Sequence, residues 1–285
     1  MKTSTSLYES ITNKIIESLK EGVLPWHKPW ASSNTFLPLR YNGIPYQGIN
    51  TLLLWIVSSD LGYTSPTWMT FKQAQELGGH VKKGERGTPV CYADTIHKES
   101  TNDQGEQEVK HFSFLRSYTV FNVEQIEGLP SQYYIKPTQG FSSDERIASL
   151  EAFVSSTGAS ITEGGDRASY IPSLDIIKMP PFASFDSPEC YYATLCHELV
   201  HWTGHPSRLD RKITNGFGSK DYAFEELVAE LGSAFLAGHL GFTPQIPDNH
   251  ASYIASWIKA LGQDHQMIFR AAGLAQKAVE FLMNS

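Results

Sequence analysis

The stretch TLCHELVHWTGHPSRLDR, Thr194–Arg211, contains the motif His-Glu-x-x-His between His197 and His201. Residues four apart on an α-helix lie on the same face, so both imidazoles can bind one metal ion. Glu198 follows the first histidine and can act as a general base on water held by that ion. The helix is otherwise apolar, which argues against two solvated histidines on a surface helix: Leu195, Leu199, Val200 and Trp202. The motif predicts a metal-dependent hydrolase site.

The third ligand of this site does not follow from the motif alone. In one class of such enzymes the motif continues as His-Glu-x-x-His-x-x-Gly-x-x-His. Gly204 matches the glycine, but the last position is Ser207, which is a poor zinc ligand, and His205 comes two residues too early. His205 therefore stays a candidate contact to substrate or to a developing oxyanion, together with Tyr222.

A later helix offers carboxylates instead. The segment DYAFEELVAELGSAFLAGH, 221–239, contains Glu225, Glu226 and Glu230 within an apolar helix. Buried carboxylates need partners, and a metal ion with its histidine ligands supplies them. We predict Glu226 as third ligand and Glu230 as acceptor of a histidine N–H. Three alternatives remain open: an exchange of roles between Glu226 and Glu230, Glu225 as the ligand, and an exposed acidic face of the helix. Two nitrogens and one oxygen favour Zn²⁺, while Mn²⁺ also suits this donor set.

Composition sets the broad class of the protein. The 285 residues are 41% hydrophobic, carry a net charge of −7 and include three cysteines, Cys91, Cys190 and Cys196, without metal-ligand spacing. The charge is too small for an imitation of DNA and argues against charge-driven duplex binding. The cysteines are typical of a reducing compartment. No signal peptide or membrane-spanning run is present, so we expect a cytoplasmic protein without membrane contact.

Periodicity divides the chain into two parts and predicts an α+β fold with two domains. Residues 1–130 combine helices at 6–21, 49–60 and 70–77 with strands between 81 and 123. Turn-rich residues 131–142 read as a linker. Residues 143–285 are mostly helical, with helices at 144–155, 188–202 and 221–239, two more between 249 and 284, and one extended segment, IPSLDIIKMP.

The N-terminal part interleaves aromatic and basic residues, a pattern that suits single-stranded nucleic acid because bases stack on rings and phosphates meet cations. The alternative is that the aromatic residues form the core of a small α+β domain. The candidate DNA contacts are Trp26, Lys28, Trp30, Arg40, Tyr46, Trp68, Phe71, Lys72, Lys82, Lys83 and Arg86.

Several segments resemble one family. GVLPWHKPW, YQGIN, SPTWMTFKQAQELGGHVKKGERGTPV and VFNVEQIEGLP are similar to the N-terminal single-stranded-DNA-binding domain of the ArdC antirestriction proteins. CHELVHWTGHPSRLDR and YAFEELVAELGSAF resemble the family's zincin-like metallopeptidase domain. The resemblance implies a plasmid- or phage-borne protein that protects incoming DNA from host restriction enzymes, for example during conjugation. Related N-terminal domains occur in plasmid primases, but this chain has no primase catalytic motif.

Two other functional classes remain open from the sequence. One is a processing or effector metallopeptidase whose first domain recruits a protein partner. The other is a binding protein with a structural metal ion and no turnover. Substitution of Glu198 distinguishes the peptidase hypothesis from hypotheses in which the protein acts without peptide cleavage.

Overall fold

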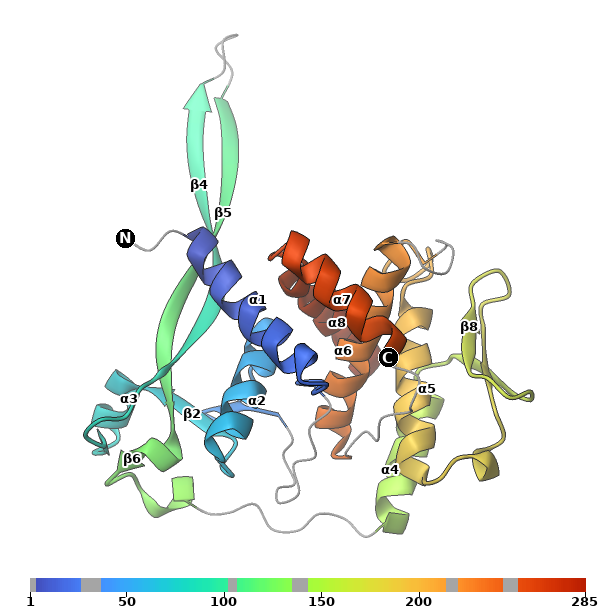
Figure 1. Cartoon of the computed structure of the whole chain (residues 1–285), viewed down its shortest axis with the longest axis horizontal. Coiled ribbons are helices and arrows are strands. Elements are labelled where there is room, and N and C mark those ends of the chain that lie inside the picture. Colours follow the sequence, from blue (N-terminus) through green and yellow to red (C-terminus); the bar gives the residue numbers. More distant parts are fainter. Residues whose placement is uncertain (1–3, 27–36, 102–106, 135–142, 214–219, 243–250) are drawn as a thin grey trace.

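The computed structural model describes residues 4–26, 37–101, 107–134, 143–213, 220–242 and 251–285 (Figure 1). The first half contains helices α1 (Ser4–Lys20), α2 (Ile49–Leu61) and α3 (Phe71–Glu76). Its strands are β1 (Leu39–Arg40), β2 (Thr67–Thr70), β3 (His80–Val81), β4 (Thr88–Thr101), β5 (Gln107–Asn122) and β6 (Ile126–Glu127). Two 3₁₀ turns, η1 (Val123–Gln125) and η2 (Ser131–Tyr134), complete it. The predicted helices and the strand-rich stretch are therefore present.

The main sheet of this half has the strand order β1-β2-β5-β4. Strands β4 and β5 form an antiparallel hairpin paired from Thr88↔Val120 out to Thr101↔Gln107. Its outer part projects away from the rest of the molecule (Figure 1). Residues 102–106, which connect the two strands in sequence, lie outside the described residues.

Helix α2 covers one face of this sheet at its base. Leu54 and Val57 on the helix cluster with Trp68, Val90 and Val120 on three strands. The apolar run of α2 is buried almost along its whole length, and the helix ends at Gly62, which has a left-handed φ of 72°. Burial of this run against the sheet explains why it is apolar all round without being a membrane segment.

The second half contains helices α4 (Ser143–Ser156), α5 (Pro188–Thr203), α6 (Lys220–Leu240), α7 (Ala251–Gln263) and α8 (Met267–Met283). It also has the strands β7 (Ser160–Glu163), β8 (Ser169–Ile171) and β9 (Ile176–Met179) and the 3₁₀ turn η3 (Phe182–Ser184). The predicted helices are confirmed within a few residues. The prediction of a single extended segment was incomplete. The structure has two strands there, β8 and β9, separated by a turn in which Asp175 has a φ of 54°.

These strands form a three-stranded sheet of order β7-β9-β8, with β8 at an edge. Strand β7 pairs with β9 in parallel, and β8 pairs with β9 in an antiparallel arrangement. The strands are only three or four residues long, too short for a clear period-two pattern in the sequence.

One hydrophobic core joins the two halves. Trp26, which follows α1, lies edge-on to Trp257 of α7 at 5.8 Å between ring centroids. Trp55 of α2 lies 5.8 Å from Phe235 of α6. Gly238 of α6 permits this approach, because a Cβ there would lie 2.8 Å from Leu37. The helices of the second half are thus partly covered by the first half, and the prediction of an α+β fold with two parts is confirmed.

Within the residues that the structure describes, no helix combines the length and apolar character needed to span a membrane.

Candidate metal centre

Helix α5 carries the motif, and its start is fixed locally. The side chain of Ser187 caps the helix by accepting a hydrogen bond from the N–H of Cys190, and Pro188 occupies the first turn. Leu195, Leu199 and Val200 are buried in the core. This packing turns His197 and His201 together toward α6.

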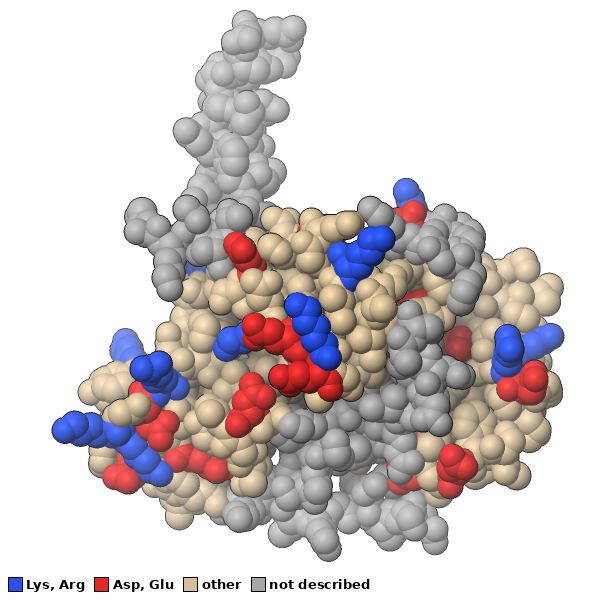
Figure 2. Space-filling view, viewed as in Figure 1, with Lys and Arg blue, Asp and Glu red and all other residues tan. Residues whose placement is uncertain are grey.

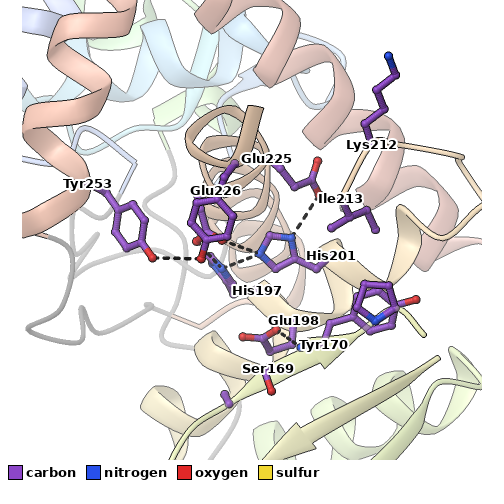
Figure 3. Close-up of a pocket in the computed structure, with 13 residues that line it drawn as sticks. Ser169, Tyr170, His197, Glu198, His201, Lys212, Ile213, Glu225, Glu226 and Tyr253 are labelled. Atoms are coloured by element: carbon purple, nitrogen blue, oxygen red, sulfur yellow. Dashed lines mark hydrogen bonds and ion pairs between the residues drawn. The ribbon is translucent and has the colours of Figure 1, made fainter. Parts of the chain in front are cut away.

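Helix α6 completes the cluster with Glu226. Its Oε2 lies 3.6 Å from Nε2 of His197, and its Oε1 lies 3.5 Å from Nε2 of His201. The two Nε2 atoms are 3.1 Å apart, and one ligand atom from each of the three residues lies within 4.8 Å of the others. Two imidazole nitrogens and one carboxylate oxygen that converge in this way fit a divalent metal ion (Figure 3).

The outer nitrogen of each histidine faces another carboxylate of α6. Nδ1 of His197 lies 3.4 Å from Oε1 of Glu230, the position predicted from the sequence. Nδ1 of His201 lies 3.2 Å from Oε1 of Glu225, a contact that the sequence analysis did not assign. Such contacts direct the Nε2 lone pairs inward, toward a metal ion.

The carboxylates shift the pKa values of the cluster. Burial lowers the pKa of His201, but hydrogen bonds with Glu225 and Glu226 outweigh it and raise the value to about 9. Burial raises the pKa of Glu226, yet the two histidines lower it well below its usual range. The pKa of Glu225 is also lowered, since His201 and Arg211 outweigh the effect of burial. The cluster thus concentrates negative charge, which a cation can balance.

Glu198 occupies a separate position beside the cluster. Its side chain is buried, and Oε2 accepts a hydrogen bond of 2.7 Å from the backbone N–H of Tyr170 in β8. Glu198 therefore lies between α5 and the edge strand, apart from the converging ligand atoms (Figure 3).

A cavity of about 290 Å³ opens over these residues. Strand β8 and the chain just before and after it line one side with Ala168, Ser169, Tyr170 and Pro172, and α6 and α7 contribute Tyr222 and Tyr253. The two phenol oxygens are 3.3 Å apart. Burial is the main cause that raises the pKa of Tyr222, and the hydrogen bond with Tyr253 adds to it. The Tyr222 hydroxyl therefore remains a protonated donor at neutral pH. Tyr253 had no signal in the sequence, because its place depends on the path of α7.

His205 takes no part in this cavity. It is absent from the described lining residues, and its Nδ1 contacts the Oγ of Ser207 at 2.7 Å. The expected contact of His205 with substrate or oxyanion is therefore corrected: the chain turns away from the site at the end of α5, and the histidine stabilises that turn.

Comparisons with known proteins cover both halves. Residues 5–121 match the family model of the N-terminal domain of the anti-restriction factor ArdC, and residues 148–274 match a zincin-like metallopeptidase model. A metal-free crystal structure of the antirestriction protein ArdC from plasmid R388 is 45% identical, with a TM-score of 0.82 over 98% of this chain and 97% of that chain. This chain belongs to the ArdC antirestriction family.

Three further matches are similar over nearly the whole of this chain. The Mn(II)-bound structure of the same R388 protein is 44% identical with a TM-score of 0.80, covering 98% of this chain and 97% of that chain. The uncharacterized protein y4eC of Sinorhizobium fredii is 37% identical over 99% of this chain and 92% of its own length. DNA primase TraC of Escherichia coli is 41% identical over 97% of this chain, which spans only 27% of that relative.

The aromatic candidates of this ArdC homologue's first half divide by burial. The exposed fractions of Trp26, Tyr46 and Trp68 are 2%, 4% and 0%, so these rings are core residues and offer no face to a base. The prediction that they contact DNA is corrected, because the α+β core requires large apolar side chains. Phe71, in contrast, is 50% exposed.

The basic candidates are mostly exposed. Arg40, Lys72, Lys83 and Arg86 lie at the surface, and Arg40 lies over the ring of Tyr46. Lys82 is half-buried and donates from Nζ to the backbone oxygen of Glu124, so its ammonium group is engaged within the fold. Lys28 and Trp30 lie outside the described residues.

Proposed function

We propose that this chain is an antirestriction protein that binds single-stranded DNA through its first half and carries a metal-dependent, peptidase-like site in its second half. It would protect incoming plasmid or phage DNA from host restriction enzymes. The observation that carries the proposal is the convergence of His197, His201 and Glu226 beside the buried Glu198, in a chain of the ArdC family.

In the proposed centre, His197, His201 and Glu226 hold a divalent cation, which when bound supplies a Lewis acid to the cavity. Zn²⁺ is the default for two imidazoles and a carboxylate, and the Mn(II)-bound R388 relative supports Mn²⁺ as an alternative. Glu198 would take a proton from the attacking water. The phenols of Tyr222 and Tyr253 point into the same cavity and would donate to the oxyanion of an attacked amide.

The proposed DNA surface lies on the open face of the main sheet. Ser117, Thr119 and Phe121 alternate along β5 and therefore share one face, on which Ser117 and Thr119 are exposed. Phe71 contacts Phe121 edge-on at 6.4 Å between centroids. Phe71, the first residue of α3, is exposed beside this face of the sheet, so its ring provides a platform on which a base can stack.

The loop Lys82–Gly87 places cations beside this face. The side chain of Gln125 donates to Glu85 and to the backbone oxygen of Arg86, which holds the loop in place. Gly87 allows its close approach, because a Cβ there would lie 2.2 Å from Thr119. Within the described part of the chain, the side chains of Lys83 and Arg86 form no hydrogen bond or ion pair, so both can meet phosphates.

Binding at this face would depend on local contacts. Figure 2 shows acidic and basic side chains intermixed on the part of the surface that carries α3 and β6, and Lys72 pairs with Glu76 at 3.7 Å. A mixed surface provides little long-range attraction for a duplex, whereas stacking plus a few phosphate contacts suits a single strand.

Metal analysis and restriction-protection assays on Glu198→Ala and Glu226→Ala test the proposed centre. We expect Glu226→Ala to lose the metal and Glu198→Ala to keep it. If both variants still protect transferred DNA, peptidase chemistry is not the mechanism of protection, and the DNA-binding half carries the function.

Titration of a fluorescent oligonucleotide with the full chain tests the DNA surface. Loss of one stacking ring costs about 1–3 kcal/mol per base, so Phe71→Ala should weaken binding by roughly 5–150-fold. Phe182→Ala is the matched control, because Phe182 is a similarly exposed phenylalanine, at 41%, in the second half. Equal effects of the two substitutions would remove Phe71 from the interface.

A processing or effector peptidase with a protein-recruiting first half remains the second candidate. It is favoured by the position of the cavity beside the edge strand β8, because an extended peptide can bind along the edge of a sheet. Under this hypothesis Glu198→Ala abolishes the biological effect while oligonucleotide binding by the wild-type chain is absent or insensitive to salt.

A further inference from the structure

The loop after α5 folds back onto the helix that carries the motif. The N–H of Arg211 donates to the backbone oxygen of Gly204 at 2.9 Å, and the N–H of Asp210 donates to that of His205 at 3.1 Å. Asp210 adopts a left-handed φ of 47°, which reverses the chain and returns it to the helix end. The side chain of Arg211 is brought in this way beneath the metal cluster.

Gly204 makes room for that side chain. A Cβ at this position would lie 3.0 Å from Nη2 of Arg211 and 2.7 Å from Cδ1 of Ile213. Its φ of −78° is accessible to any residue, so the close approach of Ile213 and of the guanidinium is the reason for glycine here. The glycine that imitates the extended zinc motif thus makes room for Ile213 and Arg211 rather than leading to a third histidine.

Arg211 is almost completely buried and uses its guanidinium in three directions. Nε and Nη2 donate to the carboxylate of Glu225, at 3.1 Å to Oε2 and 2.8 Å to Oε1. Nη1 donates to the hydroxyl of Thr203 at 2.8 Å, and Nη2 also donates to the backbone oxygen of Val200 at 2.5 Å. The exposed fractions of the Arg211 and Glu225 side chains are 5% and 7%. The guanidinium thereby fixes Glu225 relative to α5 itself.

Glu225 in turn faces the outer nitrogen of a ligand. Its Oε1 accepts from Arg211 and lies 3.2 Å from Nδ1 of His201. A carboxylate held at this position keeps the imidazole proton on Nδ1 and turns the Nε2 lone pair toward His197 and Glu226. Glu225 is the sequence neighbour of the ligand Glu226 and could compete with it for the metal ion. Its hydrogen bonds with Arg211 hold its carboxylate away from that position.

We propose that Arg211 is a positioning residue of the metal centre: it holds Glu225 against His201 and so orients the second histidine ligand. This inference rests on the proposed function, in which His197, His201 and Glu226 bind a divalent cation. A buried ion pair often adds little net stability, which makes orientation of a ligand a better reason for its presence than stability.

The same loop provides a matched control in Arg208. Its side chain is also largely buried, at 10% exposed, and pairs with Asp175. It stacks on Trp202 with its Cζ 3.8 Å from the ring centroid, and Nε donates to the Trp202 oxygen. Arg208 contacts none of the three ligands or their outer carboxylates in the described structure. Loss of either arginine therefore removes a largely buried guanidinium and its ion pair, but only Arg211 acts on a ligand.

The test is calorimetric titration of Zn²⁺ and of Mn²⁺ into the metal-stripped full chain. We expect Arg211→Met to weaken metal binding by about 10–100-fold, the usual effect of losing support behind a ligand. Arg208→Met should bind metal within about twofold of the wild type, since it leaves the ligand support intact. Arg211→Lys should fall between, because an ammonium group cannot bridge Glu225 and Val200 as the planar fork does.

Three further variants keep the test decisive if Arg211→Met fails to fold. Glu225→Gln should reproduce the loss, and combining it with Arg211→Lys should add little, because the two residues act in series. Gly204→Ala should also weaken metal binding, because the added Cβ would crowd the guanidinium as well as Ile213.

The outcomes separate this inference from the proposed function. Wild-type binding with no difference between Arg211 and Arg208 variants would overturn the role of Arg211 alone. Absence of metal binding by the wild-type chain would overturn the proposed metal centre itself.

Discussion

The two functional regions of this protein differ in how their residues are brought together. In the metal centre, two ligands and the proposed base come from five consecutive residues of α5, and the third ligand comes from one neighbouring helix. In the first half, the exposed Phe71 and Arg86 come from a helix and a loop that lie beside one face of a sheet. Local spacing decides the first region, whereas the second depends on which face of the sheet the core leaves open.

The same contrast explains why the structure brings the metal-ligand candidates together but leaves only some of the DNA-contact candidates at the surface. A His-Glu-x-x-His motif on a helix must place both histidines on one face, whatever the rest of the fold does. A tryptophan beside a lysine has no such constraint. Trp26 and Trp68 are in the core, and only burial distinguishes them from Phe71.

The largest effect is expected at the third ligand. Glu226→Gln removes the negative charge of the carboxylate whose two oxygens each face one histidine, so stoichiometric metal binding should be lost, as measured by calorimetry and metal analysis. Glu230→Gln should only weaken binding by about 10–100-fold, since Glu230 contacts the outer nitrogen of His197. The reverse order of effects would exchange the roles of the two glutamates.

Substitution of a core aromatic residue, Trp68, and of a surface aromatic residue, Phe71, should affect different properties of the protein. Trp68→Ala leaves a cavity in the α2–sheet core and should lower the free energy of unfolding by about 3–5 kcal/mol in urea titrations. Phe71→Ala should change it by less than about 1 kcal/mol while reducing oligonucleotide affinity. The comparison fails if Trp68→Ala is fully stable and loses only DNA binding.

Metal binding should stabilise both halves together. A cation that binds only the folded state contributes about 2.7 kcal/mol at 100 times its Kd. Because α1 and α2 share a core with α6 and α7, differential scanning calorimetry should show one transition that moves upward with added metal. Two transitions, of which only one moves, would show that the halves unfold separately.

The smallest effect concerns the ion pair at the β8–β9 turn. Hydrogen bonds from Arg208 lower the pKa of Asp175, so this pair stabilises the folded state above the unfolded pKa near ~3.9. That stability is lost as pH falls through the lower folded pKa. Since Asp175 is partly exposed, we expect Asp175→Asn to cost only about 0.2–1 kcal/mol at pH 7.

The cost of Asp175→Asn should vanish in acid. Urea titrations at pH 7 and near pH 2 measure it, with the wild type as reference at each pH. A cost that is equal at both values would mean that the asparagine disrupts the turn itself, where residue 175 has a positive φ.

Much of the fold could be predicted from the sequence because its helices are long and regularly patterned. Helices α1 to α6 each lie close to the predicted bounds. The short strands β7 and β8 gave no signal, since three or four residues cannot display a period. The edge strand that holds Glu198 was therefore missed.

By itself, the sequence determined the metal-binding face of α5, because a four-residue spacing on a helix is a geometric constraint. It also narrowed the third ligand to α6, because buried carboxylates require partners. Only the tertiary structure decided that Glu226 faces the histidines and that Glu225 joins His201 to Arg211. It also decided that Trp68 is core while Phe71 is surface. These outcomes depend on the rotation of one helix against another and on which sheet face is covered, and neither is set by neighbours along the chain.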